Sequence, residues 1–391
     1  MTTQTRYSFY VSCPPGLESL LSAECRELKF VVPQKTLIAY STDKGEPGED
    51  HGGLELSGTL EHLYKANLML RTASRVVVRL GEYYASSFSE LRKEASRLEW
   101  KPFIRPGQRV NIRVTCHKSK LYHSDAVAER ILGAINDHFT VAGRNPRPIT
   151  SSDEGQLIIV RLLNDICTIS IDSSGELLYK RGYKQAVAKA PLRENIAAAM
   201  IRFSGWDAAS PLVDPFCGSG TIPIEGAQMA CRVPPGISRA FRFSDWPVFD
   251  KEKWNGVLDV AKNGISDSKT AIYGYDRDAG AIEFSQANAA RAGQKNNIKF
   301  LLQAVSYLES PSKVGTIITN PPYGVRTKEN NDLRDLYARF GTILLEKFKG
   351  WTVVMLSPDD VLTGNLGLSQ PDETLRFLNG GLPVKILKYK L

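Results

Sequence analysis

The chain has 391 residues, of which 42% are hydrophobic and 24% charged, and its formal net charge is +8. This composition is typical of a soluble globular protein, and the length predicts about two or three hydrophobic cores. The chain shows no signal sequence, no apolar run of membrane-spanning length and no Cys-x-x-Cys pair among its six cysteines. We therefore expect a cytoplasmic protein without a membrane anchor, metal site or disulfide framework.

The positive charge is concentrated in one segment near the start of the chain. Residues 71–130 hold thirteen Lys and Arg against six Asp and Glu, whereas residues 1–70 hold six against nine. A basic segment of this kind is expected where a protein approaches a polyanion, although a solvated basic surface without a partner has the same composition.

The first 172 residues mix strands and helices in the irregular order of an α+β region. Alternating or helical apolar spacing and turn residues mark the elements. The predicted strands cover residues 7–13, 74–83, 109–116 and two runs joined through Asn164-Asp165, and the predicted helices cover 17–28, 61–73, 125–139 and a segment capped near Ser87 or Ser89. The polar stretch 41–53 predicts a long connection between two of these elements.

From residue 193 onward, strands alternate with helices, as in a doubly wound parallel sheet. A basic stretch with little apolar periodicity, residues 173–192, precedes this part and is interpreted as a connector. The end of the chain contains an Asn-Gly-Gly turn between two strand-like runs, which predicts a hairpin closing one edge of the sheet.

The first motif of this part is Asp-Pro-Phe-Cys-Gly-Ser-Gly-Thr at residues 214–221. A predicted strand ends at Asp214, and the glycines that follow let a ligand approach the backbone at the start of a helix. The third glycine of a dinucleotide-binding loop is replaced by Pro223, and no lysine follows Gly220 as in a phosphate-binding loop. The motif therefore favours a ligand without a pyrophosphate.

The second motif is the acidic end of the next predicted strand, at Asp276. A carboxylate there can accept both hydroxyl groups of an unphosphorylated ribose. Asp278 is expected to cap the following helix, although both residues could serve only as caps. A glycine turn with this carboxylate, and without phosphate-binding features, fits S-adenosylmethionine, an adenosine that carries an amino-acid sulfonium.

The third motif is a short β-branched run, residues 316–319, that ends in Asn320-Pro321-Pro322-Tyr323. Residues before proline are held extended and proline has no N–H, so this strand end offers two acceptors, the Asn320 carboxamide and the Pro321 carbonyl. Two acceptors suit the two hydrogens of an exocyclic amine, and Tyr323 can stack on the ring that bears it. Taken alone, the segment would more simply be a turn with a tyrosine plug; beside the other two motifs it predicts an amine-methylating site.

These motifs resemble those of class I S-adenosylmethionine-dependent methyltransferases that act on exocyclic amines. Nearly the whole chain is similar to the THUMP-containing RNA guanine-N2 methyltransferases, including the N-terminal half of the bacterial bifunctional large-subunit rRNA enzyme, through segments such as "CPPGLESLLSAE", "KSKLYHSDAVAERI" and "APLRENIAAAMI". The resemblance implies an α/β fold: a C-terminal Rossmann-like methyltransferase domain, with a mostly parallel seven-stranded sheet and an antiparallel edge hairpin, after an α+β region. The implied domains are a ferredoxin-like part at 1–60, a THUMP RNA-binding domain at 61–172, the basic connector at 173–192 and the methyltransferase domain at 193–391.

The resemblance assigns catalysis to the Asn-Pro-Pro-Tyr turn and cofactor binding to all three motifs. After its third strand the family often places an acid that holds the adenine amine, but this chain has Gln303-Ala304, so Gln303 or a backbone carbonyl would substitute. Glu225 could reach the methionine amino group or serve only in packing. The catalytic residues are then Asn320, Pro321, Pro322 and Tyr323, and the cofactor-binding residues are Asp214, Pro215, Phe216, Gly218, Ser219, Gly220, Thr221, Asp276, Arg277, Gln303 and Asn320.

Candidate RNA contacts lie in two basic segments and beside the third motif. Lys118 and Lys120 supply cations for phosphates and Tyr122 a ring for stacking, although an exposed loop without RNA would have the same composition. The other candidates, in the connector and just past the catalytic turn, are Arg181, Tyr183, Lys184 and Arg326.

The sequence thus predicts a cytoplasmic S-adenosylmethionine-dependent RNA methyltransferase that modifies guanine N2 in large-subunit (23S) rRNA. Its expected partner is structured RNA, with rRNA first and tRNA second, and neither a metal nor a membrane is expected. Three alternatives remain open: a tRNA guanine-N2 methyltransferase, a DNA adenine-N6 methyltransferase, and an RNA-binding assembly factor without catalysis. The sequence does not separate a monomer from a homodimer.

Overall fold

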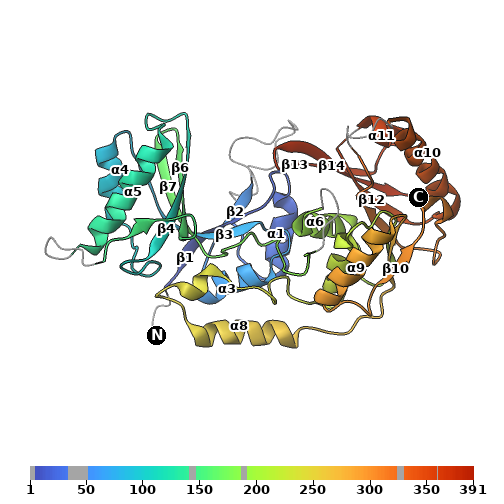
Figure 1. Ribbon diagram of the computed structural model, residues 1–391, viewed down its shortest axis with the longest axis horizontal. Helices are drawn as coiled ribbons and strands as arrows, with labels where there is room; N and C mark the ends of the chain where they lie inside the picture. Colours follow the sequence, from blue (N-terminus) through green and yellow to red (C-terminus); the bar gives the residue numbers. More distant parts are fainter. Residues whose placement is uncertain (1–4, 34–51, 141–146, 186–191, 324–329, 359) are drawn as a thin grey trace.

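The computed structural model describes residues 5–33, 52–140, 147–185, 192–323, 330–358 and 360–391. Within these residues the strands form two seven-stranded sheets, which lie one after the other along the long axis of the molecule (Figure 1). The predicted connection at 41–53 falls almost entirely outside the described residues.

The first sheet belongs to the N-terminal region and has the order β2-β1-β3-β7-β6-β4-β5. Its third strand β3 pairs with β1 through residues 75–78 and with β7 through residues 77–84, so the predicted ferredoxin-like part and the predicted RNA-binding module share one sheet. The strands are β1 (Tyr7–Ser12), β2 (Gly53–Gly58), β3 (Arg75–Tyr84), β4 (Arg109–His117), β5 (Thr150–Ser151), β6 (Gln156–Leu163) and β7 (Ile166–Asp172).

Helices of this region are α1 (Glu18–Glu27), α3 (Leu60–Met69), α4 (Phe88–Ser96) and α5 (Ser124–Phe139), and α4 packs against α5 beside the β6–β7 hairpin (Figure 1). The predicted cap of α4 is confirmed at Ser87, whose side chain accepts from the Glu90 backbone N–H while Glu90 bonds back to the Ser87 N–H. The predicted turn is confirmed as well, because Asn164 and Asp165 have φ angles of 51° and 62° between β6 and β7.

The second sheet has the order β10-β9-β8-β11-β12-β14-β13. Strands β8 to β12 are parallel, whereas β14 runs antiparallel to both β12 and β13, so the predicted parallel sheet with an edge hairpin is confirmed. Because the chain moves from β8 out to β10 and then returns to β11, β8 and β11 form the topological switch point. The strands are β8 (Leu212–Asp214), β9 (Ile272–Asp276), β10 (Lys299–Leu302), β11 (Thr316–Thr319), β12 (Thr352–Ser357), β13 (Glu373–Asn379) and β14 (Leu382–Lys390).

Helices cover both faces of this sheet, which explains the continuous β-branched run of β11. Ile317 belongs to a cluster with α10, whereas its neighbour Ile318 belongs to a cluster that includes α6 and α7. The helices are α6 (Glu194–Ser204), α7 (Thr221–Ala230), α8 (Lys251–Asn263), α9 (Ala279–Arg291), α10 (Asn330–Lys347) and α11 (Asp360–Gly364), and short 3-10 turns are η1 (Arg242–Asp245) and η2 (Val305–Tyr307).

The hydrophobic side chains of the described residues form two clusters, as the length of the chain predicts. The larger cluster joins the N-terminal region to one face of the second sheet, since Leu21 of α1 and Met200 of α6 both belong to it. Helix α8 also spans this junction, because it follows α7 in sequence yet packs against α3 along the lower edge of Figure 1. The N-terminal region and the second sheet are therefore packed together as one body.

Candidate active site

The three motifs found in the sequence meet at the carboxyl ends of the parallel strands. Asp214 ends β8, Asp276 ends the neighbouring strand β9, and Thr319 ends β11 on the other side of β8. A direct hydrogen bond joins two of these ends, since the Thr319 hydroxyl donates to Asp214 Oδ1 at 2.7 Å. The candidate site therefore lies at the switch point, where open α/β sheets bind ligands.

Residues 215–220 form a tight loop, here called the glycine loop, between β8 and α7. Gly218 and Gly220 have φ angles of +52° and +82°, and Gly220 precedes the first residue of α7. A Cβ at Gly220 would approach Ser285 Cβ to 2.9 Å, whereas one at Gly218 would meet no atom within 4 Å. Gly220 thus permits close packing, and the backbone at Gly218 borders open space where a ligand can approach it.

Two neighbouring elements hold the glycine loop in place. Asp276 Oδ2 accepts from the Gly218 N–H at 2.9 Å, and the Asn288 carboxamide of α9 donates to the Ser219 carbonyl at 3.0 Å. Asp276 Oδ1 also accepts from the Asp278 N–H at 3.0 Å. The carboxylate of Asp276 is therefore held in one orientation, while each of its oxygens keeps a lone pair for a further donor.

The expected helix cap is confirmed at Asp278, which accepts from the Gly280 and Ala281 backbone N–H groups at the start of α9. Arg277 lies exposed between the two aspartates. The Gln303 side chain donates through its nitrogen to the Tyr307 carbonyl at 3.0 Å, and its backbone N–H donates to the Asp276 carbonyl at 2.9 Å. The carboxamide oxygen of Gln303 is then the group that could accept from an adenine amine.

Asp214 is buried, with 2% of its surface exposed, and burial raises the pKa of its carboxyl to about 7. The nearby charge of Asp276 adds to this increase, whereas hydrogen bonds from the Thr319 hydroxyl and the Phe216 N–H oppose it. Because both donors bond to the same oxygen, Oδ1, the carboxyl joins β8, β11 and the glycine loop.

The Asn-Pro-Pro-Tyr corner, residues 320–323, follows β11 directly. The carboxamide oxygen of Asn320 is buried and accepts no hydrogen bond from the described residues. An unpaired buried acceptor costs about 1–3 kcal/mol, so its retention at a switch point points to a donor that a ligand brings. Pro321 is buried, and Tyr323 keeps 40% of its surface exposed at the edge of the site.

The corner is supported from α10 by Tyr337, whose hydroxyl donates to the Pro322 carbonyl at 3.3 Å. Arg326, which the sequence offers as a phosphate contact, lies outside the described residues. Sequence reasoning missed Thr319, Asn288 and Tyr337, although a buried threonine directly before the Asn-Pro-Pro-Tyr corner was a visible signal for the first of them.

The basic loop after β4 is exposed, as its candidate role in RNA binding requires. Lys118, Lys120 and Tyr122 are all exposed, and 69% of the Tyr122 surface is accessible with its ring 4.1 Å from that of His123. The loop is held in shape by Asp165, whose carboxylate accepts from the Lys120 N–H at 2.6 Å. Two cations and an aromatic ring thus lie exposed on a loop that Asp165 holds in shape.

The connector residues do not support the interpretation made from the sequence. Arg181 and Tyr183 are 3% and 4% exposed, and both bond to the buried carboxylate of Glu225. Lys184 is also largely buried and lies 3.6 Å from Glu194. Because buried side chains present no surface to RNA, these residues join parts of the protein, and Glu225 serves in packing rather than at a ligand.

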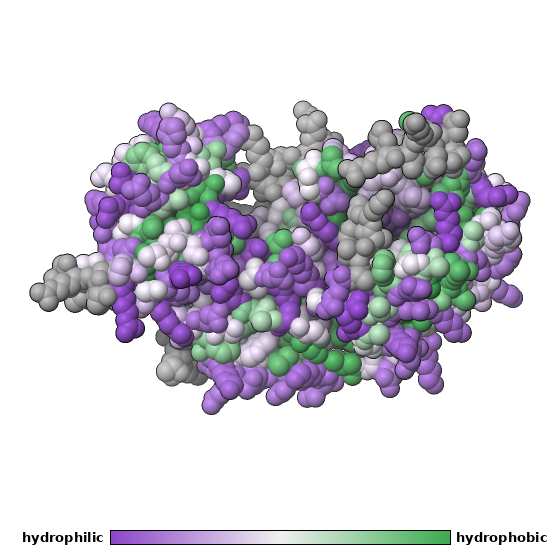
Figure 2. Space-filling model, in the orientation of Figure 1, coloured by the Kyte–Doolittle hydropathy of each residue, from purple (hydrophilic) through white to green (hydrophobic). Residues whose placement is uncertain are grey.

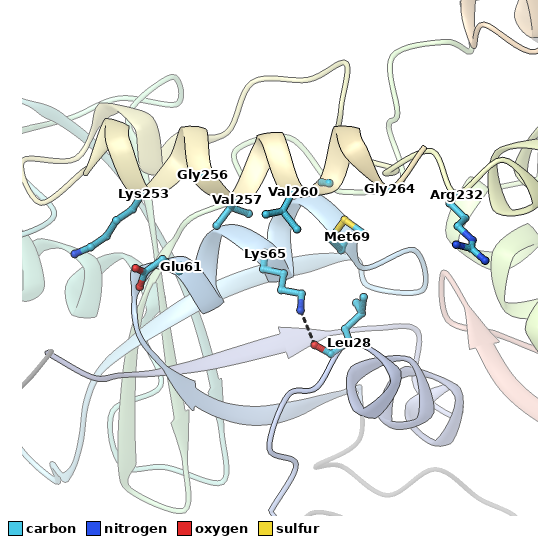
Figure 3. A pocket seen from close by; sticks show the side chains of 11 residues that line it. Leu28, Glu61, Lys65, Met69, Arg232, Lys253, Gly256, Val257, Val260 and Gly264 are labelled. Carbon is cyan, nitrogen blue, oxygen red and sulfur yellow. Dashed lines mark hydrogen bonds between the residues drawn. The ribbon is translucent and has the colours of Figure 1, made fainter. Parts of the chain in front are cut away.

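A separate cavity of about 630 Å³ lies between α8 and α3 (Figure 3). Its lining is mainly apolar, including Met69 and Val257, with Lys65 bonded to the Leu28 carbonyl at one side. Hydrophobic atoms also reach the surface along the lower edge of the molecule, where α8 lies (Figure 2). The cavity shares no residue with the switch-point site, so we do not assign the chemistry to it.

In the described part of the chain, no helix is long and apolar enough to span a membrane. In the same residues, no group of three or more His, Cys, Asp or Glu side chains is arranged to hold a metal ion. All six cysteines are free.

The parallel sheet with its edge hairpin, the glycine loop and the Asn-Pro-Pro-Tyr corner together define a Rossmann-like methyltransferase. Family models agree with this assignment. The RMKL-like methyltransferase domain matches residues 181–383, the RlmL ferredoxin-like domain matches 45–77, and the THUMP domain matches 85–172. The chain belongs to the family of RMKL-like methyltransferases with a THUMP domain.

Individual relatives can be aligned with almost the whole length of this chain. It is 30% identical to "Putative RNA methyltransferase slr0064" of Synechocystis, over 99% of this chain and 97% of that protein. It is 31% identical to "Ribosomal RNA large subunit methyltransferase K/L" of Saccharophagus degradans, over 99% of this chain and 51% of that protein. The chain therefore spans about half the length of that K/L relative.

Solved structures share the same architecture. "SMU.472, a putative methyltransferase complexed with SAH" has a TM-score of 0.88 at 27% identity, with 99% of each chain covered. "A possible methylase from Clostridium difficile 630" has a TM-score of 0.87 at 30% identity, covering 99% of this chain and 98% of that one. The arrangement of the two sheets is thus common to proteins of this family.

Proposed function

We propose that the protein transfers a methyl group from S-adenosylmethionine to the exocyclic N2 of a guanine in large-subunit (23S) rRNA. The observation that carries this proposal is the buried carboxamide oxygen of Asn320, which accepts no hydrogen bond within the described part of the chain and lies at the switch point of a methyltransferase sheet. A guanine N2 amine would supply the donor that this oxygen lacks. The K/L relative supports large-subunit rRNA as the first substrate to test.

The residues around the glycine loop fit S-adenosylmethionine. Asp276 has oxygen lone pairs for the two ribose hydroxyls, and Gln303 offers an acceptor for the adenine amine. The remaining residues assigned to this ligand are Asp214, Pro215, Phe216, Gly218, Ser219, Gly220, Thr221, Arg277 and Asn320. When bound, S-adenosylmethionine supplies an electrophilic methyl group on a positively charged sulfur.

The Asn-Pro-Pro-Tyr corner prepares the nucleophile. The lone pair of an aromatic amine is delocalised into the ring, which makes the amine a poor nucleophile. Asn320 Oδ1 and the Pro321 carbonyl would accept its two hydrogens, favour rehybridisation and orient the lone pair, while Tyr323 stacks on the base. Orientation and exclusion of water then supply most of the rate enhancement, and the surplus proton leaves to water without a strong general base.

The N-terminal region supplies the RNA contacts in this proposal. The exposed loop with Lys118, Lys120 and Tyr122 can pair with phosphates and stack on an unpaired base. The target base must leave its stack to reach the Asn-Pro-Pro-Tyr corner, as in other enzymes that modify bases.

The proposal is tested by mass analysis of nucleosides from cells that lack the protein. We expect one N2-methylguanosine to disappear from large-subunit rRNA and to return with the wild-type protein but not with Asn320→Ala. Loss of a methylguanosine from tRNA would show a tRNA guanine-N2 methyltransferase instead, and loss of a methyladenine from DNA would show a DNA adenine-N6 methyltransferase. An unchanged set of methylated nucleosides would leave a non-catalytic assembly role.

A further inference from the structure

A single buried carboxylate connects three parts of the chain. Glu225 of α7 is fully buried, and its Oε1 accepts from the Tyr183 hydroxyl at 3.2 Å and lies 3.4 Å from the Arg181 guanidinium. Its Oε2 lies 3.4 Å from the Arg71 guanidinium. We call these four residues, Glu225, Arg71, Arg181 and Tyr183, the junction cluster.

The members of the junction cluster come from different regions. Arg71 follows α3 in the N-terminal region, where its backbone N–H donates to Glu24 at 2.8 Å. Its guanidinium crosses to the methyltransferase domain and donates to the Gln228 carbonyl at 3.3 Å and to the Val233 carbonyl. Arg181 of the connector donates to the Arg71 carbonyl at 2.6 Å, so all three regions bond to one another here.

The junction cluster continues toward the glycine loop. Glu225 stands one helical turn after the loop, on the helix that the loop begins. On the other side, the Tyr183 carbonyl accepts from Arg291 of α9 at 2.8 Å, and Arg291 also bonds to Asn288. Asn288 donates to the Ser219 carbonyl at 3.0 Å. The connector is thus bonded to both helices that flank the loop.

The energetics indicate that the junction cluster serves to orient the parts it joins more than to stabilise the protein. Two guanidinium groups and one carboxylate are buried together, and burial lowers the pKa of Arg71. Buried charges of this kind cost desolvation free energy, and apolar side chains of similar size often stabilise a protein as well or better. Directional bonds, in contrast, define one arrangement of the parts they join.

We propose that Glu225 is a positioning residue that fixes the N-terminal RNA-binding region relative to the active site. This inference rests on the proposed function. RNA held at the exposed loop after β4 is thereby presented to the Asn-Pro-Pro-Tyr corner at one distance and one orientation. A structured RNA that spans both regions depends on this geometry, whereas a short RNA that reaches only the active site does not.

The test compares Glu225→Gln with wild type on two RNAs, a transcript of large-subunit rRNA and a short hairpin around the nucleotide that wild type methylates. Since a misplacement of about 1 Å can cost about 10²-fold in rate, we expect kcat on the transcript to fall at least about tenfold. On the hairpin we expect kcat to stay within about threefold of wild type, because the bonds of the Glu225 carboxylate go to Arg71, Arg181 and Tyr183 and not to a residue assigned to the methyl transfer. The affinity for S-adenosylmethionine, measured by calorimetry, should also stay within about threefold.

A matched control and a second variant keep the test decisive. Glu194→Gln also converts a buried carboxyl to an amide, but Glu194 pairs with Lys184 and not with Arg71. For this control, the ratio of kcat on the transcript to kcat on the hairpin should therefore match that of wild type. If Glu225→Gln does not fold, Tyr183→Phe removes a single bond to the same carboxylate and should lower the ratio in the same direction.

Equal losses on both RNAs would overturn the inference and leave Glu225 as a residue of general stability. No loss on either RNA would overturn it as well. Failure of the wild-type protein to methylate either RNA would instead count against the proposed function, so the two failures are distinguishable.

Discussion

The buried carboxyl of Asp214 makes the stability of the protein depend on pH in a direction that is unusual for an aspartate. Its pKa is raised from the ordinary value of 3.8 to about 7 because the group is desolvated between β8 and β11. The folded state therefore binds more protons than the unfolded state between these two values, and stability falls as pH rises through that range. At about 1.4 kcal/mol per unit, the contribution is about 4 kcal/mol.

Asp214→Asn removes this titration and leaves the contacts in place. The two donors that reach the residue, the Thr319 hydroxyl and the Phe216 N–H, both bond to Oδ1, which the asparagine retains as an acceptor. We therefore expect the variant to be more stable than wild type at about pH 7.5, with the advantage reduced at about pH 4.5. Because the unfolded carboxyl is already mostly ionised at about pH 4.5, the advantage should be about 1 kcal/mol there and about 4 kcal/mol at about pH 7.5, a difference of about 3 kcal/mol.

The assay is denaturant unfolding of both proteins in parallel at the two pH values. Asp278→Asn is the control, since an asparagine can also cap α9 and the residue is exposed. The free energy of unfolding of this control should change with pH as that of wild type does. If Asp214→Asn shows the same dependence as wild type, Asp214 is ionised throughout this range and the argument from desolvation is wrong.

Three further predictions concern ligands. Asn320→Ala should lower turnover about 10²-fold while the calorimetric affinity for S-adenosylmethionine changes much less, and equal activity would remove Asn320 from catalysis. Asp276→Ala should weaken S-adenosylmethionine binding in calorimetry and leave RNA retention in filter binding intact, whereas unchanged affinity would mean that the carboxylate serves only the glycine loop. Lys118→Ala with Lys120→Ala should lower the slope of log K against log salt for RNA binding by about 1–2, and an unchanged slope would exclude both lysines from phosphate contact.

Much of the fold was predictable because its signals are local. Capping at Ser87, the turn at Asn164-Asp165 and the β-branched run of β11 each depend on neighbouring residues, and the structure confirms all three. The convergence of the three motifs was also predictable, since the carboxyl ends of parallel strands meet at one edge of a sheet. Knowledge of β8, β9 and β11 was therefore sufficient to bring Asp214, Asp276 and Asn320 together.

The connection between the two N-terminal parts was not predictable in the same way. Strand β3 is marked in the sequence by a run of three valines, yet its first residues pair with β1 and nearly all of it pairs with β7. A β-branched run predicts a buried strand, but it does not predict which strands lie on either side of it. A boundary placed at residue 60 therefore divides elements that one sheet joins.

The connector shows most clearly what composition cannot reveal. From the sequence, Arg181 and Tyr183 look like RNA contacts, because cations beside aromatic rings also occur on RNA-binding surfaces. Their true partner, Glu225, lies more than 40 positions later on a helix with no other acidic residue. Whether an arginine faces solvent or a buried carboxylate depends on this distant pairing, and so does its function. A basic segment between two domains should therefore be compared with isolated acids on the following helices before it is assigned to RNA, because one buried carboxylate can hold a connector arginine together with an arginine of the other domain, as Glu225 holds Arg181 and Arg71.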